Sequence, residues 1–156
     1  MEEVEALMIA REDPRQADVT SLVRALDSMF ESLYPAESNH LLDLETLASP
    51  DILFFVVREA GQALGCGALW LHQDYGEVKR VYVRPEARGR KLGHVLLKRL
   101  EEEARGIGLR LLRLETGIKQ PEALGLFKAC GFVPCGAFGD YPSDDPNSVF
   151  MEKRIG

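Results

Sequence analysis

The 156-residue chain is predicted to form one α/β (α+β) domain over residues 1–156, with a mixed, mostly antiparallel sheet flanked by helices. Three observations support this. Amphipathic segments with three- and four-residue apolar spacing alternate with short β-branched runs. Glycine and proline mark the boundaries between them. A composition of 46% hydrophobic and 28% charged residues is typical of a globular protein.

The first segments predict a strand followed by two helices. Residues Val4–Ala10 form a short apolar run, the expected first strand. Asp13 and Pro14 are predicted to cap and begin a helix whose apolar face continues to Leu33, and the helix ends before Pro35. Leu41–Leu47 is a candidate second, short helix.

Three strands are expected next, at Ile52–Val57, Leu64–Leu71 and Glu77–Val83. The short polar turns between them, at 59–62 and 73–76, predict an antiparallel meander.

The second half continues with helices and strands in turn. A helix from Leu92 is predicted to end near Gly106–Gly108, and Leu109–Leu114 is the next strand. Pro121–Cys130 is another helix, and strands at Phe132–Phe138 and Ser148–Lys153 complete the order β-α-α-β-β-β-α-β-α-β-β.

Charge and cysteine content narrow the function classes. The net charge of −6 disfavours nucleic-acid binding, which needs a basic face. No apolar run approaches the roughly 20 residues that span a bilayer, and the acidic N-terminus differs from a signal peptide. A cytoplasmic protein with no membrane partner is expected. The three cysteines lack metal-ligand spacing, so no metal is predicted, and Cys66 and Cys130 are interpreted as small buried residues.

A basic, glycine-containing turn between a predicted strand and helix is the main functional signal. Such a turn directs free backbone N–H groups and the positive end of the helix dipole at one point, which favours a phosphate. Arg84, Arg88, Arg90 and Lys91 add positive charge there. A phosphate-bearing cofactor is therefore predicted. ATP or NAD is a disfavoured alternative, because neither a P-loop nor a G-x-G-x-x-G pattern is present.

The segment Pro85-Glu86-Ala87-Arg88-Gly89-Arg90-Lys91-Leu92-Gly93 resembles the pyrophosphate loop of the GNAT family of N-acetyltransferases. Arg88 and Gly93 match the first and last motif positions, whereas Lys91 replaces the middle glycine. The segment Gln120–Phe132 resembles the family's second landmark, and the order of elements agrees. The resemblance implies an enzyme of the small bacterial single-domain subgroup, an acyltransferase that moves acetyl from acetyl-CoA directly to a small-molecule amine. A homodimer is compatible with it.

The resemblance also implies a set of cofactor-binding residues. Gln120 replaces the usual asparagine and keeps an amide, whereas Phe127 replaces a tyrosine that often acts as general acid and has no ionisable atom. The backbone of the strand before the loop is expected to bind the pantetheine arm. The predicted cofactor residues are Val81, Tyr82, Val83, Arg88, Gly89, Arg90, Lys91, Leu92, Gly93, His94, Gln120 and Phe127.

Glu77 is the predicted catalytic base, because an amine with a pKa near about 10 must lose a proton before it attacks. The alternative is a solvent-facing strand residue paired with Lys79. Tyr141 is the candidate proton donor, and a surface-loop tyrosine is its alternative. Tyr34, Glu37 and His40, between the first two helices, are the predicted substrate-binding residues.

A second function remains open at this point. The departures at Lys91 and Phe127 are also compatible with a CoA-binding sensor or regulatory module that kept the fold and lost catalysis. Turnover against a panel of amines separates this module from an enzyme.

Overall fold

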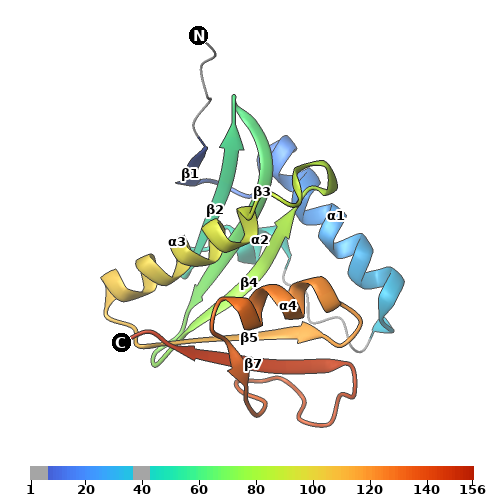
Figure 1. Cartoon of the computed structure of the whole chain (residues 1–156), viewed down its shortest axis with the longest axis vertical. Helices are drawn as coiled ribbons and strands as arrows, with labels where there is room; N and C mark the ends of the chain where they lie inside the picture. The colour runs from blue at the N-terminus through green and yellow to red at the C-terminus, as the bar shows by residue number, and fades with distance from the viewer. Residues whose placement is uncertain (1–6, 37–42) are drawn as a thin grey trace.

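The computed structural model describes residues 7–36 and 43–156 (Figure 1). A seven-stranded sheet with the order β1-β2-β3-β4-β5-β7-β6 runs through the molecule. All neighbouring strands are antiparallel except β4 and β5, which are parallel. The strands are β1 (Met8–Arg11), β2 (Ile52–Glu59), β3 (Gln62–Leu71), β4 (Gly76–Val83), β5 (Leu111–Gly117), β6 (Val133–Pro134) and β7 (Ser148–Arg154).

Helices cover both faces of the sheet. Helices α3 (Leu92–Ile107) and α4 (Pro121–Ala129) lie on the near face in Figure 1, and α1 (Ala17–Leu33) lies behind the sheet. The short α2 (Leu44–Leu47) packs with α1 on that second face, where Leu47 joins Val19 and Leu22 in one apolar cluster. The predicted fold class and order of elements are confirmed.

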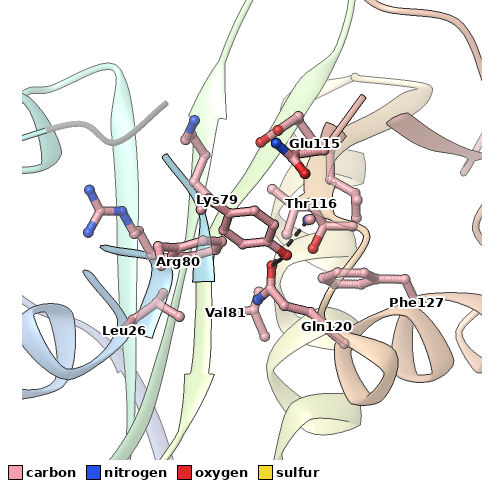
Figure 2. Close-up of a pocket in the computed structure, with 15 residues that line it drawn as sticks. Leu26, Lys79, Arg80, Val81, Glu115, Thr116, Gln120 and Phe127 are labelled. Carbon is pink, nitrogen blue, oxygen red and sulfur yellow. Dashed lines mark hydrogen bonds between the residues drawn. The ribbon is translucent and has the colours of Figure 1, made fainter. Parts of the chain in front are cut away.

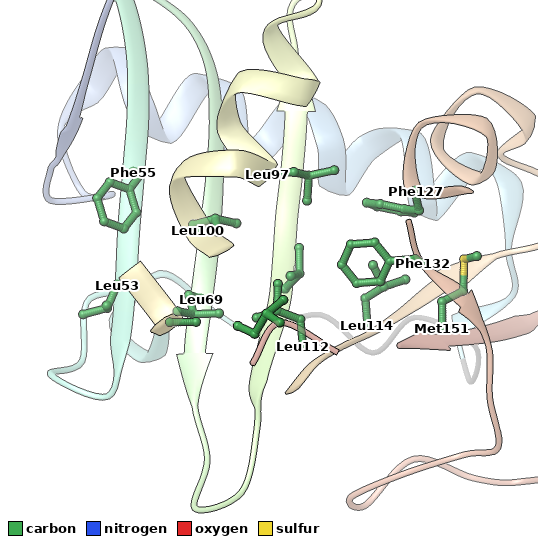
Figure 3. Packing of buried hydrophobic residues seen from close by; sticks show 13 residues of the cluster. Leu53, Phe55, Leu69, Leu97, Leu100, Leu112, Leu114, Phe127, Phe132 and Met151 are labelled. Carbon is green, nitrogen blue, oxygen red and sulfur yellow. The ribbon is translucent and has the colours of Figure 1, made fainter. Parts of the chain in front are cut away.

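The larger core lies between the sheet and the pair α3 and α4. Leu97 and Leu100 of α3 and Phe127 of α4 pack over Leu69 and Leu112 of the strands (Figure 3). Of the apolar stripe predicted for α3, Leu92, Leu96, Leu100 and Ala104 are buried, whereas Val95 is 37% exposed. None of the described helices is long and apolar enough to cross a membrane.

Several predicted boundaries were wrong. Helix α1 begins at Ala17, because the Asp13 carboxylate accepts from Arg15 N (2.9 Å) in a preceding turn and does not cap the helix. Strand β6 covers only two residues of the seven expected, and Pro134 within it has no N–H to donate to a longer ladder. Residues 1–6 and 37–42, which include parts of the predicted first strand and second helix, lie outside the described residues.

Strands β4 and β5 separate after a short contact. Only Gly76 pairs with Leu112 and Glu77 with Arg113 before the two strands diverge. On its other side, β4 bulges against β3: the register shifts between Cys66 and Ala68, and Arg80 has a left-handed φ of 57°. A bulge bends its strand and redirects side chains, so β4 turns away from β5 here.

The cysteines differ in exposure. Cys66 is fully buried and donates to the Arg80 carbonyl oxygen (3.3 Å), as predicted for a core residue. Cys130 is only partly buried, so its predicted burial was wrong in degree. Burial raises the pKa of the Cys66 thiol to about 12, which disfavours the reactive thiolate.

We expect iodoacetamide at pH 8 to alkylate Cys130 and Cys135 in the folded protein but to reach Cys66 only after unfolding in denaturant. Peptide mass spectrometry of the labelled protein, with and without denaturant, measures each site. Labelling of folded Cys66 at the rate of Cys135 would contradict the burial described above.

Candidate functional site

A groove of about 730 Å³ opens between α1, α4 and the end of β4. Its walls contain all the residues predicted to bind the cofactor except Arg90. The Arg90 guanidinium instead pairs with both carboxylate oxygens of Glu59 (3.1 and 2.5 Å). Three residues of α1 also line the groove but were not predicted to do so: Leu26, Met29 and Leu33. Their periodicity indicates a buried helix face but does not show what covers that face.

The loop between β4 and α3 is shaped for an anion. Gly89 (φ 84°) and Lys91 (φ 60°) both adopt left-handed backbone conformations, and Lys91 is the N-cap residue of α3 with no side-chain cap. The first backbone N–H groups of the helix therefore have no intrahelical partner and face the loop. Left-handed φ explains why glycine suits position 91, and lysine adopts the same conformation.

Gly93 and Arg88 fix the walls on either side of this loop. A Cβ on Gly93 would lie 2.8 Å from the Leu126 side chain, so the missing side chain lets α3 approach α4. Arg88 donates from Nε to the Val83 carbonyl oxygen (3.1 Å) and lies 5.7 Å from the Tyr82 ring centroid. The loop is thus tied to the end of β4.

A smaller cavity of about 70 Å³ lies where β4 and β5 separate (Figure 2). It shares five lining residues with the groove, and it is therefore the inner end of the same depression: Leu26, Val81, Gln120, Ala123 and Phe127. Phe30, Val78 and Leu114 add apolar wall. Lys79, Arg80, Glu115, Thr116 and Asn147 add polar groups.

Tyr34 fastens α1 to the loop after β5. Its hydroxyl accepts from Lys119 N (3.0 Å) and donates to Gln120 Oε1 (3.3 Å), and burial raises the pKa of this phenol. Gly117 N also donates to Gln120 Oε1 (3.1 Å), which identifies that atom as the carbonyl oxygen. The structure places predicted substrate residue Tyr34 in the wall of the inner cavity, whereas Glu37 and His40 lie outside the described residues.

Arg80 is buried in the β4 bulge and forms an ion pair with Asp27 of α1. Burial lowers the pKa of Arg80 and raises that of Asp27, while the attraction between the two opposes both shifts. The pair joins α1 to β4 beside the inner cavity. The alternation of the predicted strand gave no signal for it, because the bulge changes which way Arg80 points.

Glu77 is the centre of a buried polar cluster. It is only 2% exposed, so the solvent-facing alternative was wrong, although the pairing with Lys79 is present (Nζ to Oε2, 3.4 Å). The Tyr141 hydroxyl donates to Glu77 Oε2 and accepts from Lys79 Nζ (2.7 Å). His72 Nε2 lies 3.1 Å from Glu77 Oε1. Glu77 itself does not line the inner cavity, but Lys79 does.

Tyr141 belongs to this cluster and to an aromatic one. Its ring packs against Phe138 and Phe150, with centroids 5.3 and 5.6 Å away, so it is not an exposed loop residue. Burial and the negative charge of Glu77 raise the pKa of the Tyr141 phenol. At neutral pH the phenol therefore keeps its proton and remains a hydrogen-bond donor.

Comparison with known proteins agrees with this geometry. The model of the acetyltransferase (GNAT) family matches residues 19–132. An "IAA acetyltransferase" of Azospirillum brasilense is 52% identical over 149 residues, covering 94% of this chain and 97% of the relative. The uncharacterized N-acetyltransferase YsnE of Bacillus subtilis is 36% identical over 140 residues, covering 88% and 92%.

Solved structures are similar over nearly the whole chain. A Klebsiella pneumoniae protein assigned as an acyl-CoA N-acyltransferase superposes with a TM-score of 0.81 at 38% identity, covering 96% of this chain and 98% of that one. The PaiA N-acetyltransferase of Thermoplasma acidophilum, solved in complex with coenzyme A, has a TM-score of 0.71 at 18% identity, covering 96% and 99%. At that identity the likeness concerns the fold alone.

Gly117→Ala is expected to lower the free energy of unfolding by about 1–3 kcal/mol. The added Cβ would lie 1.8 Å from the Tyr34 hydroxyl oxygen and 2.8 Å from Gln120 Oε1, so the contact between α1 and the β5–α4 loop must shift. Urea denaturation measures the change. Gly125→Ala in α4 is the matched control, because nothing lies within 4 Å of its added Cβ. Equal stability of the two variants would show that Gly117 does not constrain the site.

Proposed function

The chain belongs to the acetyltransferase (GNAT) family, and from this membership and its groove we propose that it transfers acetyl from acetyl-CoA directly to the amine of a small molecule. The family predicted from the loop at 88–94 and the segment Gln120–Phe132 is thereby confirmed. One observation supports the finer proposal: the groove runs from a loop shaped for an anion to the smaller inner cavity between β4 and β5.

The groove suits an acyl-CoA in both shape and chemistry. The N-terminus of α3 and the ammonium of Lys91 would hold the pyrophosphate, with His94 beside them in the groove wall. The extended backbone from Val81 to Val83 would receive the pantetheine arm as an added strand. The thioester then reaches the inner cavity, where Phe127 offers an aromatic wall and no proton. A protein of the same fold, from Thermoplasma acidophilum, was solved with coenzyme A, so the fold is compatible with this cofactor.

The Glu77 cluster supplies the proton chemistry. A bound ammonium must lose one proton before attack, and we assign this proton to Glu77, which receives it through the hydroxyl of Tyr141. After attack on the thioester carbonyl, the second N–H proton passes through Tyr141 to the leaving sulfur. Lys79 donates to Tyr141 and lines the cavity, so it links this hydroxyl to the cavity wall.

Direct transfer is favoured over a cysteine intermediate. Cys66 is fully buried, and neither Cys130 nor Cys135 lines the groove or the inner cavity. Burial raises the pKa of all three thiols, which lowers their thiolate content and their nucleophilicity.

The sensor alternative has less support than the enzyme. The sensor alternative was based on the departures from the family pattern at Lys91 and Phe127. Lys91, however, adopts the left-handed conformation that the loop needs. The proton-carrying cluster of Glu77 and Tyr141 is also complete without a tyrosine at position 127. A cytoplasmic location and a homodimer remain predictions from the sequence.

Calorimetric titration is expected to show micromolar binding of acetyl-CoA and none of ATP. Lys91→Gly should weaken acetyl-CoA binding by about threefold to tenfold, because an ammonium near the phosphates is lost while the backbone loop is kept. Arg90→Ala is the matched control, since Arg90 pairs with Glu59 outside the groove, and its affinity should stay within about twofold. Absence of acetyl-CoA binding to the unmodified protein would overturn the proposed function.

Turnover with an amine panel tests the base. We expect Glu77→Gln to lower kcat by about 100-fold or more, and Tyr141→Phe by about tenfold or more, with the acetyl-CoA affinity of both retained. Phe138→Leu is a useful control, because it disturbs the same aromatic cluster without removing a proton carrier. Full activity in Glu77→Gln would exclude Glu77 as the base.

A further inference from the structure

We propose that His72 relays the proton released in each turnover from Glu77 to solvent. This inference rests on the proposed function, because it needs Glu77 as the proton acceptor. No sequence motif assigns a role to His72, which directly follows β3 in the turn to β4.

The stoichiometry of the reaction requires a proton exit. An acceptor that binds as an ammonium carries two protons more than the nitrogen of the neutral amide bears after transfer. One of the two protonates the thiolate of coenzyme A, and the other must leave the protein in every cycle. If Glu77 takes this proton and cannot release it, the next turnover cannot start.

Glu77 has little contact with solvent of its own. Its side chain is 3% exposed, and Oε2 faces Tyr141 and Lys79, of which Lys79 lines the inner cavity. Oε1 faces His72 Nε2 at 3.1 Å. The His72 side chain is 27% exposed, compared with 10% for Lys79 and 3% for Glu77.

The imidazole ring is held in place for this contact. It lies between Trp70 and Tyr75, with both ring centroids 4.6 Å away, and the Tyr75 ring is stacked at 23°. The His72 N–H also donates to the Tyr75 carbonyl oxygen (3.0 Å), which fixes the backbone. With Nε2 directed at Glu77, Nδ1 is the ring atom left for water.

These contacts define a relay with balanced protons. The acceptor ammonium gives a proton to the Tyr141 oxygen as the phenol proton moves to Glu77 Oε2. Rotation of the carboxylic acid then brings its protonated oxygen to His72 Nε2, which accepts the proton and becomes part of an imidazolium. The imidazolium releases a proton to water, and proton exchange with water returns the imidazole to the tautomer with its proton on Nδ1. Glu77 is a carboxylate again, and no bond to carbon has changed. His72 does not touch the acceptor, so it is a positioning and relay residue.

The test compares His72→Ala and His72→Gln with the unmodified protein in initial-rate kinetics. We expect kcat to fall by about tenfold or more in both variants, while the KM for acetyl-CoA is unchanged. Added imidazole should restore most of the activity of His72→Ala, because a free base can occupy the vacated space. It should not rescue His72→Gln, whose amide keeps the contact to Glu77 but cannot carry a proton.

Tyr75→Phe is the matched control, because it keeps the ring that stacks on His72 and is expected to retain activity. Activity of His72→Gln within twofold of the unmodified protein would overturn the relay, and so would a loss in His72→Ala that imidazole does not repair. Glu77→Gln separates the two proposals: if that variant is inactive while His72→Gln is fully active, only the relay fails. If Glu77→Gln is active, the base assignment fails first.

Discussion

Parallel strands β4 and β5 share two paired positions and then separate, and the space that opens between them holds the inner cavity. Buried backbone groups that lose their ladder partners must find others. Here β4 bulges at Arg80, and the end of the strand lines the groove. The backbone of this segment can therefore pair with the amide groups of a ligand. The same divergence that creates the cavity therefore also prepares its binding surface.

Closing the other side of this opening requires α1 to stay close to the β5–α4 loop. Tyr34 makes that connection, and it fits only because Gly117 has no Cβ. Gln120 is held by the same contact and lies in the walls of both the groove and the cavity. The Gln120 amide, which was predicted to contact the cofactor, therefore also holds the loop after β5 in place. This contact fixes the width of the site.

Charges beside the cavity are buried in pairs. Lys79 contacts Glu77, and Arg80 contacts Asp27, because an unpaired buried charge would cost several kcal/mol. The two pairs differ in consequence. Arg80 and Asp27 join α1 to β4, whereas Glu77 also contacts Tyr141 and His72 and so connects the cavity side of the sheet with the surface. A cluster of this kind can move protons where an isolated ion pair cannot.

The sequence alone determined the order of elements, the family, and the position of the basic, glycine-containing loop before α3, because these depend on local periodicity and on residues adjacent along the chain. Eleven of the twelve residues that it predicted to bind the cofactor line the groove. The partners of Glu77 at positions 72 and 141, the contact of Tyr34 with Gln120, and the pairing of Arg90 with Glu59 were decided only by the tertiary structure. Strand divergence, the bulge at Arg80 and the packing of the β6–β7 connection bring together residues distant in the chain, and no local pattern encodes those distances.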